Sequence, residues 1–327
     1  MKARHLAIGL CCLLLLFPSI AQSQAKLGSE RKFSARVIYD ALSPSNALLW
    51  LGEDLGFYEK HGLDVQVVHG RGAMVVQALV SGSVEFGAFG GPSTIAAVLS
   101  GSALVLVAAK PNFMVMSIWT GKDSPIKSLG DLKGKTIGVS RPGSSTHTIA
   151  RLALRKAGVM EKDVKFVFHG ALPDIFVSLG KGLVDAGVAS APRPGFTELV
   201  DLSTERIPFL QGAIQVQRGF LQSRRAVVLD FLKAYVESIK VAKEKPDLAI
   251  GSIVKRLRMK PEDARAGYRS FANVWEEIPY VRSESVQAIL DLQPKEVVKK
   301  ITSERFIDNS LLKELEESGF IAELYRK

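Results

Sequence analysis

Small hydroxylic residues, glycines and arginines cluster where apolar, strand-like runs of this sequence give way to helical ones. The candidate ligand-binding residues are Ser43, Ser45, Asn46, Arg71, Gly91, Ser93, Thr94, Arg141, Gly143, Ser144, Ser145, Thr146, Ser190 and Arg193. Loops at the carboxyl ends of parallel strands lead into helix N-termini, whose free N–H groups and positive dipole end favour a negative charge. Hydroxyls add hydrogen bonds, and arginines add a counter-charge. The pattern therefore predicts a site for a small anion.

The segment Arg141 to His147, RPGSSTH, is the expected main anion clamp. A strand-like run, TIGVS, ends there, the Pro-Gly pair favours a turn, and a helix follows. This arrangement would aim backbone N–H groups and the hydroxyls of Ser144 and Ser145 into a cleft. A serine in front of a helix also commonly caps it, so capping alone is the alternative at both positions.

The motifs that usually mark catalytic residues are absent from the sequence. Both cysteines, Cys11 and Cys12, fall in the N-terminal apolar run, so the remainder of the chain has no thiol for catalysis, zinc or disulfides. Gly-x-Ser-x-Gly, Gly-Lys-Ser/Thr and His-Glu-x-x-His motifs are absent from the sequence. The sequence predicts a binding protein and not an enzyme, with no metal and no cofactor.

Three histidines are candidates for a chemical role. His69 and His169 occupy matching positions, but no acidic residue follows either one at metal-ligand spacing, and a histidine at a strand end often bonds only to backbone. We therefore expect both to be structural. His147 lies inside the helix that follows the clamp and is a further candidate for contact with a ligand or with the opposite lobe.

The chain contains two similar segments, residues 69–92 and 169–192, one hundred positions apart. The matching pairs are His69/His169, Gly70/Gly170, Leu79/Leu179, Gly82/Gly182, Val84/Val184, Gly87/Gly187 and Pro92/Pro192, with Glu85 aligned to Asp185. Each copy has the pattern of a strand, a helix and a second strand. Two similar α/β units predict two lobes with a cleft between them, which is a place for a small ligand.

Length and composition agree with two domains. The chain has 327 residues, of which 47% are hydrophobic and 23% charged, as in ordinary α/β globular proteins. The formal net charge is +10, but basic residues are scattered among acidic ones and no nucleic-acid-binding motif is present. We therefore expect a solvated basic surface and no nucleic acid partner.

The first 25 residues have the features of an export signal. Lys2 and Arg4 precede an apolar run, Ala7 to Phe17, and cleavage is expected after Ala21 or Ala25. That run is shorter than the roughly 20 residues of a membrane span. Lipid attachment at a cysteine is disfavoured because Leu10, not a small residue, precedes Cys11. The mature protein should be soluble in the periplasm.

Strand and helix patterns alternate along the mature chain. Expected strands are Arg31–Asp40, Val65–Val68, Val84–Phe89, Ala103–Ala109 and Asp131–Ser140, and expected helices include Asn46–Gly62, Met74–Ser81 and Ser93–Ser100. Extended runs at Met114–Thr120 and Ala213–Phe220 are expected to cross between the lobes. The predicted divisions are a signal peptide at 1–25, lobe 1 at 31–117, lobe 2 at 118–217, and a return to lobe 1 with C-terminal helices at 218–327.

Four segments, taken in order, carry a resemblance to a known family. They are GFYEKHGLDVQVV, ALVSGSVEFGAFGGPSTIAAVLSG, SLGDLKGKTIGVSRPGSSTH and LGKGLVDAGV. Together they resemble the nitrate/sulfonate/taurine group of ABC-transporter substrate-binding proteins. The resemblance implies a type II periplasmic binding fold: two α/β lobes, a hinge of two crossover segments, and a helical C-terminal region. It also implies a monomer that closes over a sulfonate, carboxylate or nitrate-like ligand and delivers it to an ABC permease in the inner membrane.

Other interpretations stay open at this point. An exported sensor domain for a membrane receptor shares the fold and cannot be separated by sequence. A neutral or cationic ligand also remains possible, in an aromatic-lined pocket to which Phe89 and Trp119 could contribute. A thiamine-pyrimidine synthase-like enzyme is less favoured because the sequence lacks a cysteine-rich iron-binding run. Within the main interpretation, we expect Ser45 and Ser93 to approach the ligand from one lobe, and Ser144 with Arg193 from the other.

Overall fold

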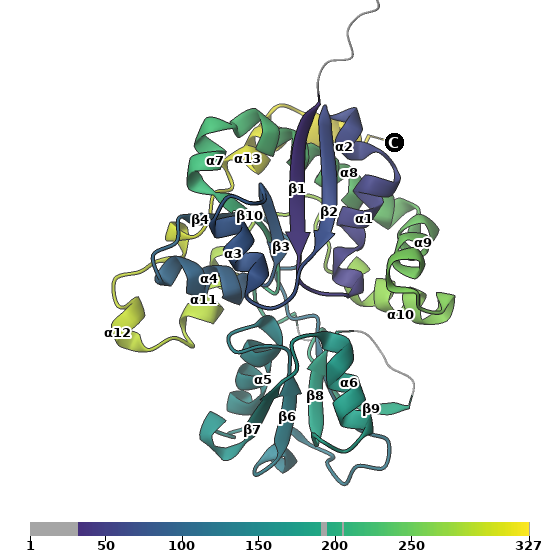
Figure 1. Ribbon diagram of the computed structural model, residues 1–327, viewed down its shortest axis with the longest axis vertical. Coiled ribbons are helices and arrows are strands. Elements are labelled where there is room, and N and C mark those ends of the chain that lie inside the picture. Colours follow the sequence, from purple (N-terminus) through teal and green to yellow (C-terminus); the bar gives the residue numbers. More distant parts are fainter. Residues whose placement is uncertain (1–31, 191–194, 205, 327) are drawn as a thin grey trace, which may run out of the picture. The chain divides into compact units, whose positions relative to one another are not determined.

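Two five-stranded sheets organise the computed structural model, which describes residues 32–190, 195–204 and 206–326 (Figure 1). The first sheet has the order β2-β1-β3-β10-β4 and the second has the order β7-β6-β8-β5-β9. The first sheet consists of β1 Phe33–Tyr39, β2 Leu63–His69, β3 Phe86–Phe89, β4 Leu104–Ala109 and β10 Ala213–Gln217. The second consists of β5 Ser117–Gly121, β6 Thr136–Val139, β7 Lys165–Phe168, β8 Ala186–Ala189 and β9 Phe196–Asp201. The predicted class, two α/β lobes, is confirmed.

The two sheets share one topology. In the first, β1 pairs in parallel with β2 and β3, whereas β10 is antiparallel to both β3 and β4. In the second, β6 pairs in parallel with β7 and β8, and β5 is antiparallel to both β8 and β9. In each sheet the antiparallel strand is thus the first that the chain adds after arriving from the other sheet. The chain passes between the sheets at residues 110–116 and returns at 202–212. The expected crossings at Met114–Thr120 and Ala213–Phe220 were therefore misplaced, because these runs mainly form β5 and β10 within the sheets.

The sequence repeat corresponds to β2-α3-β3 and β7-α6-β8, with α3 at Met74–Val80 and α6 at Leu172–Gly180. The aligned acidic residues, Glu85 and Asp185, form equivalent hydrogen bonds in the two sheets. The Glu85 carboxylate accepts a hydrogen bond from the backbone N–H of Arg36 at 2.7 Å, and the Asp185 carboxylate accepts one from Thr136 at 2.8 Å. Each acid therefore ties the start of a central strand, β3 or β8, to its parallel neighbour, β1 or β6. Such charge-assisted bonds to backbone are stronger than neutral ones.

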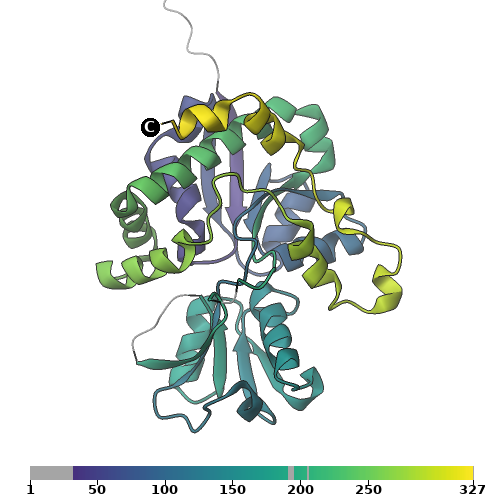
Figure 2. The same ribbon diagram turned by 180° about the vertical axis from the view of Figure 1, so that it is seen from behind.

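Helices cover both faces of the two sheets (Figures 1 and 2). The helices beside the first sheet include α1 Ala47–Asp54, α2 Phe57–Lys60, α4 Gly91–Leu99, α7 Arg218–Ser223, α8 Arg225–Glu244, α9 Pro246–Leu257, α10 Pro261–Ala272, α11 Ser283–Leu290, α12 Lys295–Val298, α13 Ser310–Glu317 and α14 Phe320–Leu324. One face packs on α1, α8 and α9, and the opposite face packs on α3, α4 and α11. The second sheet lies between α5, Ser145–Lys156, and α6.

Two of the expected elements were wrong in their bounds, and one strand was not predicted. The helix expected over Asn46–Gly62 is split into α1 and α2, because Gly56 adopts the left-handed conformation that ends a helix, with φ of 69°. The strand expected over Asp131–Ser140 begins only at Thr136, after a short 3-10 helix at Leu129–Leu132 and a turn at Gly134 with φ of 77°. Strand β9 was not predicted, since it is an edge strand whose side chains are mostly half-buried.

No helix within residues 32–190, 195–204 and 206–326 combines the length and the apolar character needed to cross a membrane. The predicted signal peptide, residues 1–25, lies outside the described residues.

Candidate functional site

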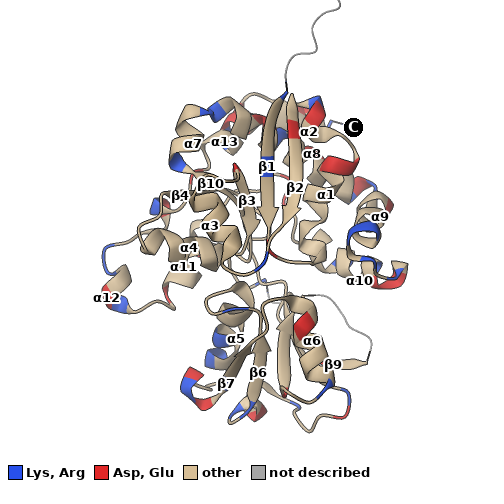
Figure 3. Ribbon diagram, in the orientation of Figure 1, with Lys and Arg blue, Asp and Glu red and all other residues tan. Residues whose placement is uncertain are grey.

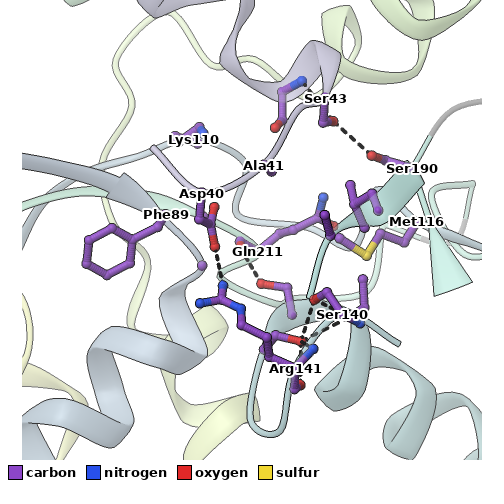
Figure 4. Close-up of a pocket in the computed structure, with 18 of the residues that line it drawn as sticks. Asp40, Ala41, Ser43, Phe89, Lys110, Met116, Ser140, Arg141, Ser190 and Gln211 are labelled. Atoms are coloured by element: carbon purple, nitrogen blue, oxygen red, sulfur yellow. Dashed lines mark hydrogen bonds and ion pairs between the residues drawn. The ribbon is translucent and has the colours of Figure 1, made fainter. Parts of the chain in front are cut away.

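A cavity of about 60 Å³ lies where the carboxyl ends of β1, β3, β4, β6 and β8 converge (Figure 4). Its lining comes from both sheets and from both passages between them. The lining residues are Asp40, Ala41, Ser43, Ser45, Phe89, Gly90, Lys110, Pro111, Met116, Ser140, Arg141, Ser144, Ser145, Thr146, Gly170, Ala171, Leu172, Ser190, Gln211 and Gly212. The predicted residues that reach this lining are Ser43, Ser45, Arg141, Ser144, Ser145, Thr146 and Ser190.

Two serines join the sheets at the edge of the cavity. Ser43 follows β1 and Ser190 follows β8, and their hydroxyl oxygens are 2.9 Å apart. Ser43 also caps the short 3-10 helix Pro44–Asn46, because its hydroxyl accepts a hydrogen bond from the N–H of Ser45 at 3.3 Å. Both hydroxyls are buried. The pair holds loops from the two sheets together above the cavity.

The expected clamp forms the N-terminus of α5. Ser144 is the N-cap: its hydroxyl accepts from the N–H of His147 at 3.4 Å and donates to the carbonyl of Arg141 at 2.8 Å. The Ser145 hydroxyl donates to the carbonyl of Gln211 at 2.7 Å, which ties the helix to the return passage. These hydroxyl protons are therefore already used within the protein. What the segment offers a ligand is the free N–H groups of the first helical turn.

Arg141 spans from the second sheet to the first. Its guanidinium forms an ion pair with the Asp40 carboxylate at 2.6 Å and donates to the carbonyl of Gly72 (Figure 4). Both side chains of the ion pair are largely buried, at 17% and 14% exposure. Because the positive charge of Arg141 already has a carboxylate partner, it is not by itself the unbalanced charge in the cavity.

Lys110, which sequence reasoning missed, supplies that unbalanced charge. It directly follows β4 and is only 6% exposed. Its ammonium donates to the side-chain oxygen of Asn46 and faces the carbonyl of Ala88 at 3.5 Å. Burial lowers the pKa of Lys110 to about 8, while the negative charge of Asp40 acts in the opposite direction. The available signal was a lysine at the end of an entirely apolar strand, LVLVAA.

Asn46 has a supporting position. Its side-chain oxygen accepts from Lys110, and its side-chain nitrogen donates to the carbonyl of Ala41 at 2.6 Å. It is fully buried and is not among the residues that line the cavity. Asn46 therefore orients the buried lysine and the loop after β1.

Other predicted residues lie elsewhere. Arg71 forms an exposed ion pair with Asp174 at 3.2 Å. Gly91, Ser93 and Thr94 belong to the first turn of α4, outside the lining, where a Cβ on Gly91 would lie 2.3 Å from the carbonyl oxygen of Leu210. Gly143 turns the chain with φ of 67° and donates its N–H to the His147 ring at 3.0 Å. Arg193 lies outside the described residues.

The three candidate histidines, His69, His147 and His169, are not among the residues that line the cavity. The ring of His69 packs against Tyr39, and that of His147 packs edge-on against Phe166 and Phe168. The ring of His169 is 3.3 Å from the Ser178 hydroxyl. Burial lowers the pKa of all three rings. In the described part of the chain, no group of three His, Cys, Asp or Glu side chains could hold a metal ion.

Neutral residues complete the cavity wall. Phe89, a candidate from the sequence, and Met116 contribute apolar surface. Gln211 accepts from the N–H of Val115 at 2.6 Å and donates to its carbonyl at 3.3 Å, so it joins the two passages between the sheets. Trp119 is a core residue of the second sheet: its indole N–H donates to the carbonyl of Ala189 at 3.2 Å.

Comparison with known proteins identifies relatives of this chain and of its fold. A family model described as NMT1/THI5 like matches residues 43–249. The solved periplasmic aliphatic sulphonate binding protein SsuA of Escherichia coli aligns with a TM-score of 0.67 at 22% identity, covering 84% of this chain and 92% of that one. The periplasmic nitrate-binding protein NrtA of Synechocystis PCC 6803 aligns with a TM-score of 0.72 at 16% identity, covering 90% and 91%.

Two curated proteins match over shorter segments. A putative aliphatic sulfonates-binding protein of Escherichia coli is 35% identical over 95 residues, 29% of this chain and 30% of that protein. A putative thiamine biosynthesis protein of Haemophilus influenzae is 28% identical over 127 residues, 38% of this chain and 40% of that protein. The chain thus aligns with less than half the length of either relative.

Proposed function

Because the chain belongs to the NMT1/THI5-like family, we propose that it is a solute-binding protein that captures a small anion between its two lobes. One observation carries this proposal. Among the described residues that line the cavity at the strand ends are a buried lysine and an arginine from different sheets, with one carboxylate to balance them. A buried charge is costly without a partner. An anion in the cavity would supply one.

The geometry supports a small anionic group. The cavity lies at the carboxyl ends of the strands, where open α/β sheets bind their ligands, and the N-terminus of α5 that faces it favours negative charge. A volume of about 60 Å³ fits a head group such as a sulfonate, a carboxylate or nitrate. The names of the sulfonate-binding and nitrate-binding relatives agree with these chemical classes.

We propose delivery to an ABC permease as the biological role, with the protein acting in the periplasm as a monomer and not as an enzyme. Lys, Arg, Asp and Glu positions are interspersed on helices such as α9 and α10 (Figure 3). This distribution supports a solvated surface more than a nucleic acid partner.

Closure over the ligand would occur about the two passages at residues 110–116 and 202–212. Three side-chain contacts that join the sheets support this: the Arg141–Asp40 ion pair, the Ser43–Ser190 hydrogen bond and the Arg71–Asp174 ion pair. A ligand biases closure only as far as the closed state gives it contacts that the open state lacks. In small-angle scattering with a bound ligand, we expect the radius of gyration to fall.

A thermal-shift screen of the purified mature protein tests the proposal. The panel contains methanesulfonate, taurine, acetate and nitrate. Neutral pyrimidines are included as the competing class of ligand, because one relative is named as a thiamine biosynthesis protein. A ligand at a hundred times its Kd should stabilise the protein by about 2.7 kcal/mol. Sodium chloride at matched ionic strength is the control. Shifts with neutral compounds only would contradict an anion-binding function.

A further inference from the structure

We propose that Lys110 selects the charge of the ligand, so that the cavity formed with Arg141 and Asp40 is a site for one negative charge. The inference rests on the proposed function and specifies the class of anion. Lys110 is not among the residues expected from the sequence patterns, and it comes from the passage between the sheets and not from a helix N-terminus.

The lysine is held in place by the fold. Its backbone N–H donates to the carbonyl of Gly212 at 2.9 Å, which joins the outgoing and returning passages. Gly212 packs closely on the lysine side chain: a Cβ there would lie 3.4 Å from Cδ of Lys110. The ammonium then reaches the oxygens of Asn46 and Ala88. An ammonium has three donors, so one is left for a ligand in the cavity that it lines.

Charge counting in the cavity gives the selectivity. Asp40, at the end of β1, and Arg141, at the end of β6, are the charged residues that face Lys110 among the described lining residues. The other lining groups are neutral, including Gln211 and Gly212 of the return passage and Phe89 and Gly90 at the end of β3.

Arg141 is paired with Asp40 at 2.6 Å, whereas the acceptors of Lys110 are uncharged amide and carbonyl oxygens. Among the described lining residues, one positive charge is left over. A monoanion balances it, whereas a dianion such as sulfate would leave a buried negative charge without a partner. Burial lowers the pKa of this lysine, so it holds its proton loosely while no anion is bound. Binding of a monoanion at mildly alkaline pH should therefore draw a proton onto Lys110.

Calorimetric titration of the mature protein with matched anions tests the charge rule. Methanesulfonate, nitrate and acetate serve as monoanions, and sulfate and malonate serve as dianions. We expect at least tenfold tighter binding of the best monoanion. Lys110→Met should weaken monoanion binding at least tenfold, and the control variant Lys122→Met, at an exposed position, should not. Asp40→Asn adds one net positive charge to the cavity, so it should shift the preference at least tenfold toward sulfate.

Proton uptake gives a second readout that a merely structural lysine would not change. With a pKa of about 8, Lys110 should take up roughly 0.7 proton per ligand at pH 8.5. The uptake is measured from binding heats in two sulfonate-free buffers of different ionisation enthalpy. Lys110→Met should take up none.

The outcomes separate this inference from the function on which it rests. Monoanion binding that is unchanged in Lys110→Met, or a wild-type preference for dianions, would overturn the role of Lys110 and leave anion capture intact. If no anion of either class binds to the wild-type protein, the proposed function fails and the charge rule fails with it.

Discussion

The buried ammonium of Lys110 should make the unliganded protein more stable as the pH rises from 7 to 10. The pKa of this side chain is about 8 in the folded protein, against 10.5 for an ordinary lysine. The unfolded chain therefore binds the proton more tightly than the folded one. Below pH 8 the folded state carries the full cost of burying the charge, and this cost disappears as the pH rises toward 10.5.

The magnitude follows from the pKa difference. At about 1.4 kcal/mol per pKa unit, the maximum cost is about 3 kcal/mol, of which roughly 2 to 3 kcal/mol should be recovered between pH 7 and pH 10. Urea unfolding at constant ionic strength measures the free energy of unfolding at each pH. The difference between wild type and Lys110→Met isolates this residue, because the other titrating groups are common to both proteins.

We expect the gain in free energy of unfolding of Lys110→Met over wild type to be largest at pH 7 and to fall toward pH 10. Loss of the hydrogen bond to Asn46 offsets the curve by a constant amount without changing its slope. Lys122→Met, at an exposed position, should give a flat curve. A flat curve for Lys110→Met as well would refute the reasoning, because it would mean that this lysine is not buried in its charged form.

Three further predictions concern other parts of the structure. Ser144→Ala removes the N-cap of α5 and should lower the free energy of unfolding by about 1 kcal/mol in urea unfolding; unchanged stability with a tenfold loss of anion affinity would instead identify the hydroxyl as a ligand contact. Glu85→Gln and Asp185→Asn should each lower the free energy of unfolding in urea by about 1 to 2 kcal/mol, because each carboxylate accepts a hydrogen bond from a backbone N–H of the neighbouring strand. Clearly unequal losses would argue against equivalent roles. Arg71→Ala breaks an exposed ion pair with Asp174 and should change stability by less than about 1 kcal/mol and leave anion affinity unchanged, as measured by thermal melting and calorimetry.

Periodicity and the internal repeat predicted the framework because they report local structure. The repeat gave two strand-helix-strand units, and these form the parallel part of each sheet. The antiparallel strands β5 and β10 join sheets that are completed by distant parts of the chain, so no local pattern determines their partners. The split of the first expected helix depends on the conformation of a single glycine, Gly56.

The cavity was only partly predictable for a similar reason. Loop chemistry identified Ser43, Ser190 and the start of α5. It could not show that Arg141 would be paired with Asp40, because that contact links residues 101 positions apart. It also missed Lys110, since a lysine is usually exposed and only the tertiary structure buries this one.

A crystal structure of the mature protein with a bound anion from the screen tests the central claim most directly. We expect the anion in the cavity between the sheets, with an oxygen about 2.7 to 3.2 Å from Nζ of Lys110 and another near the N-terminus of α5. An anion bound elsewhere on the protein, with this cavity filled only by water, would contradict the account.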